Sequence, residues 1–268
     1  MTEIQTEGLN VLIAGEGYSL KYIQSSRFLR KLYTTSDKII EGIVNIDFNT
    51  FKELAKKCKA FQIDLVIVED KRWINEGISD VLRSNFVNCI APSAKWTELG
   101  VPTFETRNIL KKYGINLPEI TLLPANFPLV VKGNGVSRKV NSVQEVIEIR
   151  EEVHKRSSVI ARDLYLEKYL DGKKITISSL FDTKNLLTFP VKDIPEDIIN
   201  NYSQYFERML NNENASFIGF INSEVILYNN KLYNVGISFE FPTLNCDMDI
   251  LYILWLAIYQ KLDEVSFY

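Results

Sequence analysis

Short apolar runs alternate with amphipathic segments through residues 10–91, and this alternation constrains the fold more than any other feature of the sequence. The apolar runs lie at 10–14, 38–45, 64–68 and 87–91. Segments with apolar residues at helical spacing lie between them, at 18–33, 48–61 and 73–85. Buried strands separated by helices predict a doubly wound parallel sheet, that is, a Rossmann-like domain.

The first run ends in the turn Gly15-Glu16-Gly17. In the dinucleotide-binding fingerprint G-x-G-x-x-G such a turn holds a phosphate, but here Leu20 stands in the position of the third glycine. We therefore interpret the turn as a tight connection from strand to helix. An NAD-dependent oxidoreductase stays an alternative, although the run at 38–45 carries no acidic residue at its end and Asp47 lies two residues beyond it.

The pattern changes after Ala94 to shorter strands mixed with helices. Two helical pieces broken at 100–102 come first, and a hairpin is predicted around Asn229-Asn230. The predicted strands are 129–132, 164–169, 175–181, 186–191, 217–228 and 232–241, and the predicted helices are 143–156, 195–210 and 249–262. The last of these helices is apolar nearly all round and is expected to be buried. The chain is therefore expected to combine an α/β part with an α+β part.

Composition excludes several classes of function. Lys and Arg total 31 against 34 Asp and Glu, so the net charge of -3 gives no long-range attraction to nucleic acid or to an anionic membrane, and neither partner is expected. The three cysteines, Cys58, Cys89 and Cys246, argue against a disulfide framework and a closed zinc site. The single histidine, His154, lies in a charged helical stretch. Without a signal peptide or an apolar run of about 20 residues, a cytoplasmic protein is expected.

Seven segments follow one family pattern in order along the chain. They are NVLIAGEG, IDLVIVED, CIAPSAKWTELG, KKYGINLP, FPLVVKGNGVSRKV, YLEKYLDGKKITI and ASFIGFINSEVIL. Together they resemble glycinamide ribonucleotide synthetase (phosphoribosylamine glycine ligase), of the ATP-grasp superfamily. The resemblance implies a Rossmann-like domain over residues 1–104, followed by an ATP-grasp domain over 105–268 with a small lid subdomain at approximately 118–170. The family's C-terminal domain is expected to be absent.

The resemblance also implies a nucleotide site. Lys132 occupies the position of the family's phosphate-contacting lysine, where an ammonium neutralises phosphate charge. Glu167, Lys168, Tyr169 and Leu170 match the hinge strand, whose backbone binds adenine and whose acidic residue binds the adenine amino group or the ribose. From the residues alone, Lys132 also fits a surface lysine at the end of a strand that enters a hairpin.

Other parts of the pattern depart from the family. The glycine-rich flap is shortened after Gly135, and Val101, Pro102 and Thr103 replace a segment that carries a lysine in the family. The long loop with the motif GPNTGGMG is absent between 191 and 194. These changes remove groups that would contact phosphate and substrate.

The expected magnesium strand has also lost its oxygen ligands. Aligned by the hairpin turn, Asn234 replaces a glutamate, Gly236 an asparagine and Ser238 an arginine. A shifted register places Glu240 on the glutamate but Pro242 on the asparagine. Asp247 and Asp249 are alternative ligands, or they cap the last helix. We therefore predict no metal ligand and no catalytic residue.

These departures lead to the expectation of a truncated and degenerate ATP-grasp protein. It would serve as a nucleotide-binding or protein-interaction module, with weak ATP binding and the role of Mg²⁺ left open. The aromatic C-terminal end is expected to pack in the core, and an interface with a protein partner or in a homo-oligomer is the alternative. The alternative is an active ATP-dependent carboxylate-amine ligase of purine biosynthesis, completed by a partner chain or by Glu240, Asp247 and Asp249.

Overall fold

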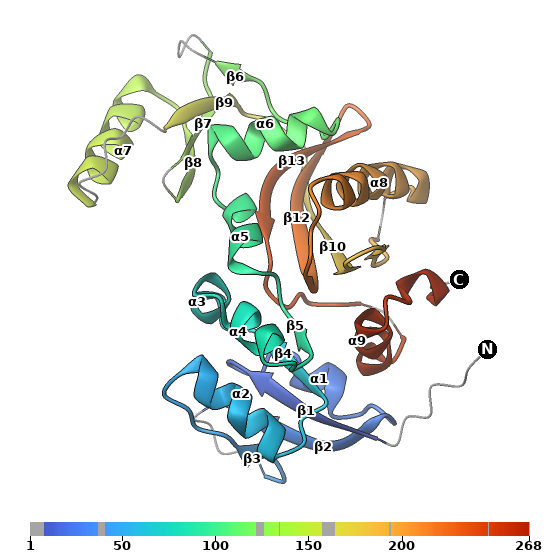
Figure 1. The fold of residues 1–268 in the computed structure, drawn as a ribbon. Helices are drawn as coiled ribbons and strands as arrows, with labels where there is room; N and C mark the ends of the chain where they lie inside the picture. The colour runs from blue at the N-terminus through green and yellow to red at the C-terminus, as the bar shows by residue number, and fades with distance from the viewer. Residues whose placement is uncertain are drawn as a thin grey trace.

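The computed structural model describes residues 8–36, 41–121, 126–133, 135–156, 164–192, 194–245 and 247–267. Three sheets organise this part of the chain, and they follow one another along the sequence (Figure 1). The first is parallel, and the other two are antiparallel. The mixed α/β and α+β architecture expected from the sequence is confirmed.

The first sheet has the strand order β3-β2-β1-β4-β5, and every pair in it is parallel. Its strands are β1 (Leu9–Ala14), β2 (Leu29–Thr34), β3 (Val44–Asn45), β4 (Leu65–Val68) and β5 (Cys89–Ile90). Its helices are α1 (Leu20–Ile23), α2 (Phe51–Ala60), α3 (Lys71–Asn75) and α4 (Ile78–Ser84). All residues of β1 and β4 are buried because apolar side chains cover both faces of the sheet.

Two predictions for this region were wrong. The segment 18–33, predicted as one helix, contains only the short α1 and then strand β2, which pairs with β1 along its length. Pairing with a strand distant in sequence overrode the local helical spacing. The helix predicted at 73–85 is divided into α3 and α4 at Gly77, whose φ of +82° breaks the helix. Of the strand predicted at 38–45, the structure has β3, while residues 37–40 lie outside the described part.

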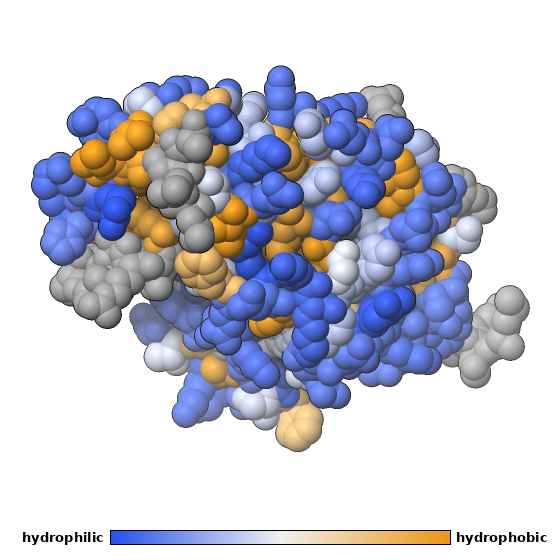
Figure 2. Space-filling model, turned by 90° about the horizontal axis from the view of Figure 1, so that it is seen from above, coloured by the Kyte–Doolittle hydropathy of each residue, from blue (hydrophilic) through white to orange (hydrophobic). Residues whose placement is uncertain are grey.

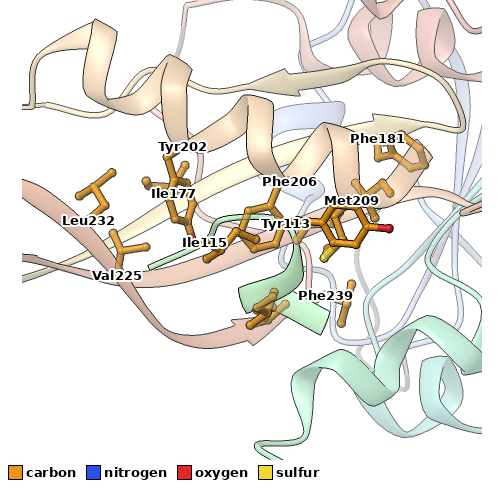
Figure 3. Close-up of a cluster of buried hydrophobic side chains, with 14 of the residues drawn as sticks. Tyr113, Ile115, Ile177, Phe181, Tyr202, Phe206, Met209, Val225, Leu232 and Phe239 are labelled. Atoms are coloured by element: carbon orange, nitrogen blue, oxygen red, sulfur yellow. The ribbon is translucent and has the colours of Figure 1, made fainter. Parts of the chain in front are cut away.

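The third sheet in chain order, here called the core sheet, has the strand order β11-β10-β12-β13. Its strands are β10 (Lys173–Asp182), β11 (Leu186–Thr188), β12 (Ile218–Tyr228) and β13 (Lys231–Ser238). Asn229 and Asn230 both have positive φ, as a two-residue hairpin turn requires, so the predicted hairpin is confirmed. Helix α8 (Glu196–Asn212) covers one face through a large apolar cluster (Figure 3).

The last helix, α9 (Ile250–Ile258), lies between the core sheet and the first sheet. Its residues share one apolar cluster with Val11 and Ile67 of the first sheet and with Leu180 and Phe220 of the core sheet. The prediction that the last helix is buried is therefore confirmed. A backbone bridge between Ala91 and Ile218 also joins the two sheets.

The second sheet, here called the lid sheet, has the order β6-β9-β7-β8. Its strands are β6 (Ile120–Thr121), β7 (Leu129–Gly133), β8 (Val136–Val140) and β9 (Tyr165–Lys168), and α7 (Val143–Arg156) packs on it. Helices α5 (Ala94–Thr97) and α6 (Phe104–Lys112), with a 3₁₀ turn at Glu98–Gly100, connect it to the first sheet. The division into domains 1–104 and 105–268 stays a prediction.

On the face that Figure 2 shows, hydrophilic residues predominate and apolar residues lie among them. Val143 and Ile147 of α7 are among the exposed large apolar side chains. No helix within the described ranges is long and apolar enough to cross a membrane. Cys58 and Cys89 are free and buried, and Cys246 lies outside the described residues.

Candidate functional site

A cavity of about 450 Å³ lies between the lid sheet and the core sheet. Lys132 and Glu167, two of the five residues predicted to bind nucleotide, line it. Its other walls come from the segment 99–103, from α6, from the hairpin residues 135–137, and from β12 and β13. The stretch around Lys132 is thus both a strand with its hairpin, β7 to β8, and part of a cavity wall.

A buried group of three charged side chains occupies the wall of this cavity. Lys132 Nζ lies 2.9 Å from Glu167 Oε2, and the two residues are only 5% and 2% exposed. Arg107 of α6 forms an ion pair with the other oxygen of the same carboxylate, and its Nη2 donates to the carbonyl of Pro118 at 2.6 Å. Glu167 therefore pairs with two cations, one from the lid sheet and one from α6.

Lys132 also contacts the core sheet. Its Nζ donates to the carbonyl oxygen of Val235 at 2.7 Å. Val235 is the extra residue of a β-bulge, since Val225 pairs with Asn234 and Glu224 pairs with Gly236. A bulge turns a backbone group out of the ladder, and here it provides an acceptor for a lysine of another sheet.

Tyr165 of β9 lies beside the three charged groups. Its ring centroid is 5.7 Å from the guanidinium carbon of Arg107. Burial, and then the negative charge of Glu167, raise the pKa of Tyr165 to about 12. The phenol is therefore neutral at physiological pH and adds a polar hydroxyl but no charge to the cavity.

The other three predicted residues do not line the cavity. The Lys168 side chain is exposed, and its backbone N–H donates to the carbonyl of Glu119 at 2.8 Å. The ring of Tyr169 lies under Lys139 Nζ at 4.0 Å, and Leu170 is buried. The structure thus brings Lys132 and Glu167 together but places 168–170 outside the cavity lining. A role for these three residues in adenine binding stays a prediction.

Asn234, at the position expected for a metal-binding glutamate, lines the cavity, but it carries an amide that is hydrogen-bonded within the protein. The side chain of Asn234 donates to the hydroxyl of Tyr202 at 2.8 Å and to the carbonyl of Gly236 at 3.2 Å. Tyr202 belongs to the apolar cluster under α8 (Figure 3), where burial raises the pKa of its hydroxyl. Glu224, the cross-strand partner of Gly236, does line the cavity, and its Oε2 lies 2.8 Å from Lys174 Nζ.

The side chains present do not fit a magnesium ion held by the protein. The part of the chain that the structure describes contains no group of three or more His, Cys, Asp or Glu side chains that could hold a metal. Glu240 pairs with Lys71 at 3.2 Å, and Asp249 caps α9 and accepts from Ser26. Neither these two residues nor Asp247 line the cavity. A single available carboxylate, Glu224, leaves an Mg²⁺ ion dependent on phosphate and water oxygens.

The glycine turn after β1 binds a carboxylate side chain of the protein itself. The buried carboxylate of Glu69 accepts hydrogen bonds from the backbone N–H groups of Gly17, Tyr18 and Ser19, at 2.8, 2.7 and 2.5 Å. These are the donors that a dinucleotide phosphate would use in such a turn. A cavity of about 800 Å³ lies next to the turn, but this arrangement counts against the NAD alternative.

Sequence reasoning missed several groups in the cavity, among them Arg107, Glu224 and the Val235 carbonyl. A signal existed for Arg107, because it follows Thr103 by one helical turn and so lies on the same face as the position where a family lysine is lost. The charge of Glu224 in an otherwise uncharged strand was a weaker signal. The bulge at Val235 has no local signal, because it depends on the register between two strands.

Comparisons with known proteins agree with this geometry. No protein-family model matches the chain. A phosphoribosylamine–glycine ligase from Fusobacterium nucleatum is 22% identical over 208 residues, which cover 68% of this chain and 49% of that protein. The chain therefore spans about half the length of this curated relative.

Solved structures show the fold. The phosphoribosylamine–glycine ligase of Thermotoga maritima superposes with a TM-score of 0.63 and 15% identity, over 87% of this chain and 69% of that one. A biotin carboxylase–βγ-ATP complex from Campylobacter jejuni gives a TM-score of 0.71 and 11% identity, over 94% and 71%. The expected resemblance is confirmed: the chain is similar in sequence to the ligase and has the fold of ATP-grasp enzymes.

Proposed function

We propose that this protein binds a purine nucleoside triphosphate in the cavity between the lid sheet and the core sheet, and that it does not catalyse ligation. The observation that carries the proposal is the pair of cations, buried Lys132 and partly buried Arg107, in a cavity of ATP-grasp topology. Buried or half-buried cations bind phosphate more strongly than exposed ones, because water does not screen them. The biotin carboxylase complex, whose name includes ATP, supports the choice of ligand.

Two features support the absence of ligation. The residues that line the cavity offer one available carboxylate for a divalent cation, and the side chain of Asn234 is an amide that is hydrogen-bonded to Tyr202 of α8. Ligation through an acyl phosphate needs metal to neutralise the charge that develops on the phosphates. We therefore assign the protein a nucleotide-binding role descended from a ligase of purine biosynthesis.

The binding part of the proposal is tested by titration calorimetry of the full chain with ATP, ADP and adenosine. ATP is expected to bind and adenosine to bind more weakly, because the cations contact phosphate. Lys132→Met is expected to weaken ATP binding by about tenfold, the value of one charge-assisted hydrogen bond. Lys168→Met is the matched control, since the Lys168 side chain is exposed and outside the cavity lining. Equal effects of the two substitutions would refute this site.

The catalytic part is tested by ADP release in the presence of phosphoribosylamine, glycine and Mg²⁺. No release above the background without protein is expected. Clear release would favour the alternative, an active ATP-dependent carboxylate-amine ligase. An additional role as a protein-interaction module, a partner chain or homo-oligomer, and a cytoplasmic location stay predictions.

A further inference from the structure

The charges that line the cavity do not balance. Three cationic side chains, Lys71, Arg107 and Lys132, face two carboxylates, Glu167 and Glu224. Lys71 and Glu224 each have an exposed partner of opposite charge, Glu240 and Lys174 respectively. The excess positive charge is therefore located in the buried group of Arg107, Lys132 and Glu167. An excess buried charge is unfavourable unless an anion approaches it.

Glu167 already occupies the position relative to the cations that a phosphate would take. One carboxylate oxygen is paired with Arg107, and the other lies 2.9 Å from Lys132 Nζ. A guanidinium and an ammonium that share one carboxylate can share a phosphate group in the same way, because both ligands present oxygens with partial negative charge. A carboxylate and a phosphate that contact the same two cations repel each other, so the carboxylate lowers the affinity of the cations for phosphate.

We propose that Glu167 is an internal counterion that competes with the ligand phosphates for Arg107 and Lys132, and so makes the cavity selective for polyanionic ligands. The inference rests on the proposed function and deepens it. A singly charged ligand gains too little to displace a buried carboxylate, whereas a di- or triphosphate brings enough charge to do so.

Two substitutions change the charge of this group in opposite directions. Glu167→Gln raises the excess to two positive charges, and Arg107→Gln removes it. Relative to the wild-type protein, Glu167→Gln is expected to bind sodium tripolyphosphate about tenfold more tightly and Arg107→Gln about tenfold more weakly, as one charge-assisted hydrogen bond predicts. If these side chains were only structural, both substitutions would weaken binding. That result, or unchanged affinity of Glu167→Gln, would overturn the inference.

Glu119→Gln is the matched control. It removes a carboxylate that precedes β6, the strand paired with β9, and whose side chain is 83% exposed and lies 3.8 Å from Lys168, outside the cavity lining. The net charge of the protein changes equally, and tripolyphosphate affinity is expected to change less than twofold, because water screens an exposed charge. If Glu167→Gln does not fold, Glu167→Asp replaces it. Its shorter side chain cannot reach both cations, and binding tighter than that of the wild type is expected.

A parallel titration with ATP separates this inference from the proposed function. If the two substitutions shift tripolyphosphate binding as expected but ATP binds no more tightly than tripolyphosphate, the nucleotide proposal fails and the counterion remains. If ATP binds the wild-type protein more tightly than tripolyphosphate but Glu167→Gln has no effect on either ligand, the counterion inference fails and the nucleotide proposal remains.

Discussion

Glu224 on β12 lies directly across the ladder from Gly236 on β13, and its Oε2 is 3.2 Å from the position that a Cβ on Gly236 would take. An acidic side chain thus lies opposite Gly236, at the position where the family pattern has an asparagine. The cavity contains a carboxylate in this region but lacks a set of ligands that would surround a metal ion.

This arrangement predicts the effect of magnesium on nucleotide affinity. Mg²⁺ neutralises part of the triphosphate charge and so weakens the attraction of the nucleotide to Lys132 and Arg107. Contact between Mg²⁺ and the single carboxylate of Glu224 offsets little of this loss of affinity. ATP is therefore expected to bind more tightly in EDTA than in excess MgCl₂, as measured by calorimetry at constant ionic strength. Glu224→Gln should tighten binding of metal-free ATP by about threefold, because it removes a repelling charge. Tighter binding with Mg²⁺ would indicate an intact metal site.

Glu69 is predicted to be essential for stability, because its carboxylate is the acceptor for three backbone N–H groups of the glycine turn. A glutamine amide has one acceptor oxygen where the Glu69 carboxylate has two, so at least one buried N–H group would lose its acceptor. Glu69→Gln should lower the free energy of unfolding by about 3 kcal/mol, measured by urea denaturation. Glu76→Gln, at an exposed residue that ends α3, should change it by less than about 0.5 kcal/mol. A loss below about 1 kcal/mol for Glu69→Gln would argue against this role.

Glu213 makes stability dependent on acidic pH. Hydrogen bonds from Lys112 Nζ at 2.7 Å and then from the Tyr113 hydroxyl at 2.6 Å lower the pKa of this carboxyl below its ordinary value of 4.5. The contribution of a carboxyl with a lowered pKa is complete above its unfolded pKa, and it is lost as the pH falls through the folded pKa. Glu213→Gln should therefore be less stable than the wild type at pH 7, and the two should converge as the pH falls well below 4.5.

Urea titrations between neutral and acidic pH check this prediction. In the Lys112→Met background the same substitution should have a smaller effect at neutral pH, because the first of the two hydrogen bonds is already missing. A difference between Glu213→Gln and the wild type that does not vary with pH would show that Glu213 acts through packing and not through its charge.

Gly219 is predicted to tolerate no side chain. A Cβ at this position would lie 2.9 Å from the carbonyl carbon of Ala91 and 3.0 Å from the nitrogen of Pro92, where the first sheet bridges to the core sheet. Backbone atoms cannot move aside without separating the two sheets, so Gly219→Ala should destabilise the protein by about 2 kcal/mol. Gly236→Ala is the control, because its nearest neighbour is the flexible end of Glu224. Equal losses for the two substitutions would contradict this explanation.

Several parts of the fold could be predicted from the sequence because their signals are local. The alternation of apolar runs and helical segments identified the parallel sheet, and Asn229-Asn230 identified the hairpin between β12 and β13. The nearly continuous apolar character of 249–262 predicted a buried helix. Periodicity and turn chemistry act within a few residues, so a single sequence contains them. The resemblance to the ligase family led to Lys132 and Glu167, which the structure places 2.9 Å apart.

Only the tertiary structure decided how these groups are used. Strand β2 replaces a predicted helix because its partner β1 supplies the hydrogen bonds, and a bulge at Val235 aims a carbonyl at a lysine of another sheet. Glu69 fills the glycine turn from 50 residues or more away in sequence, and Arg107 reaches a carboxylate 60 residues away. The residue types were visible in the sequence. Their pairing was not, because ion pairs and strand registers depend on distances that arise only when remote segments pack together.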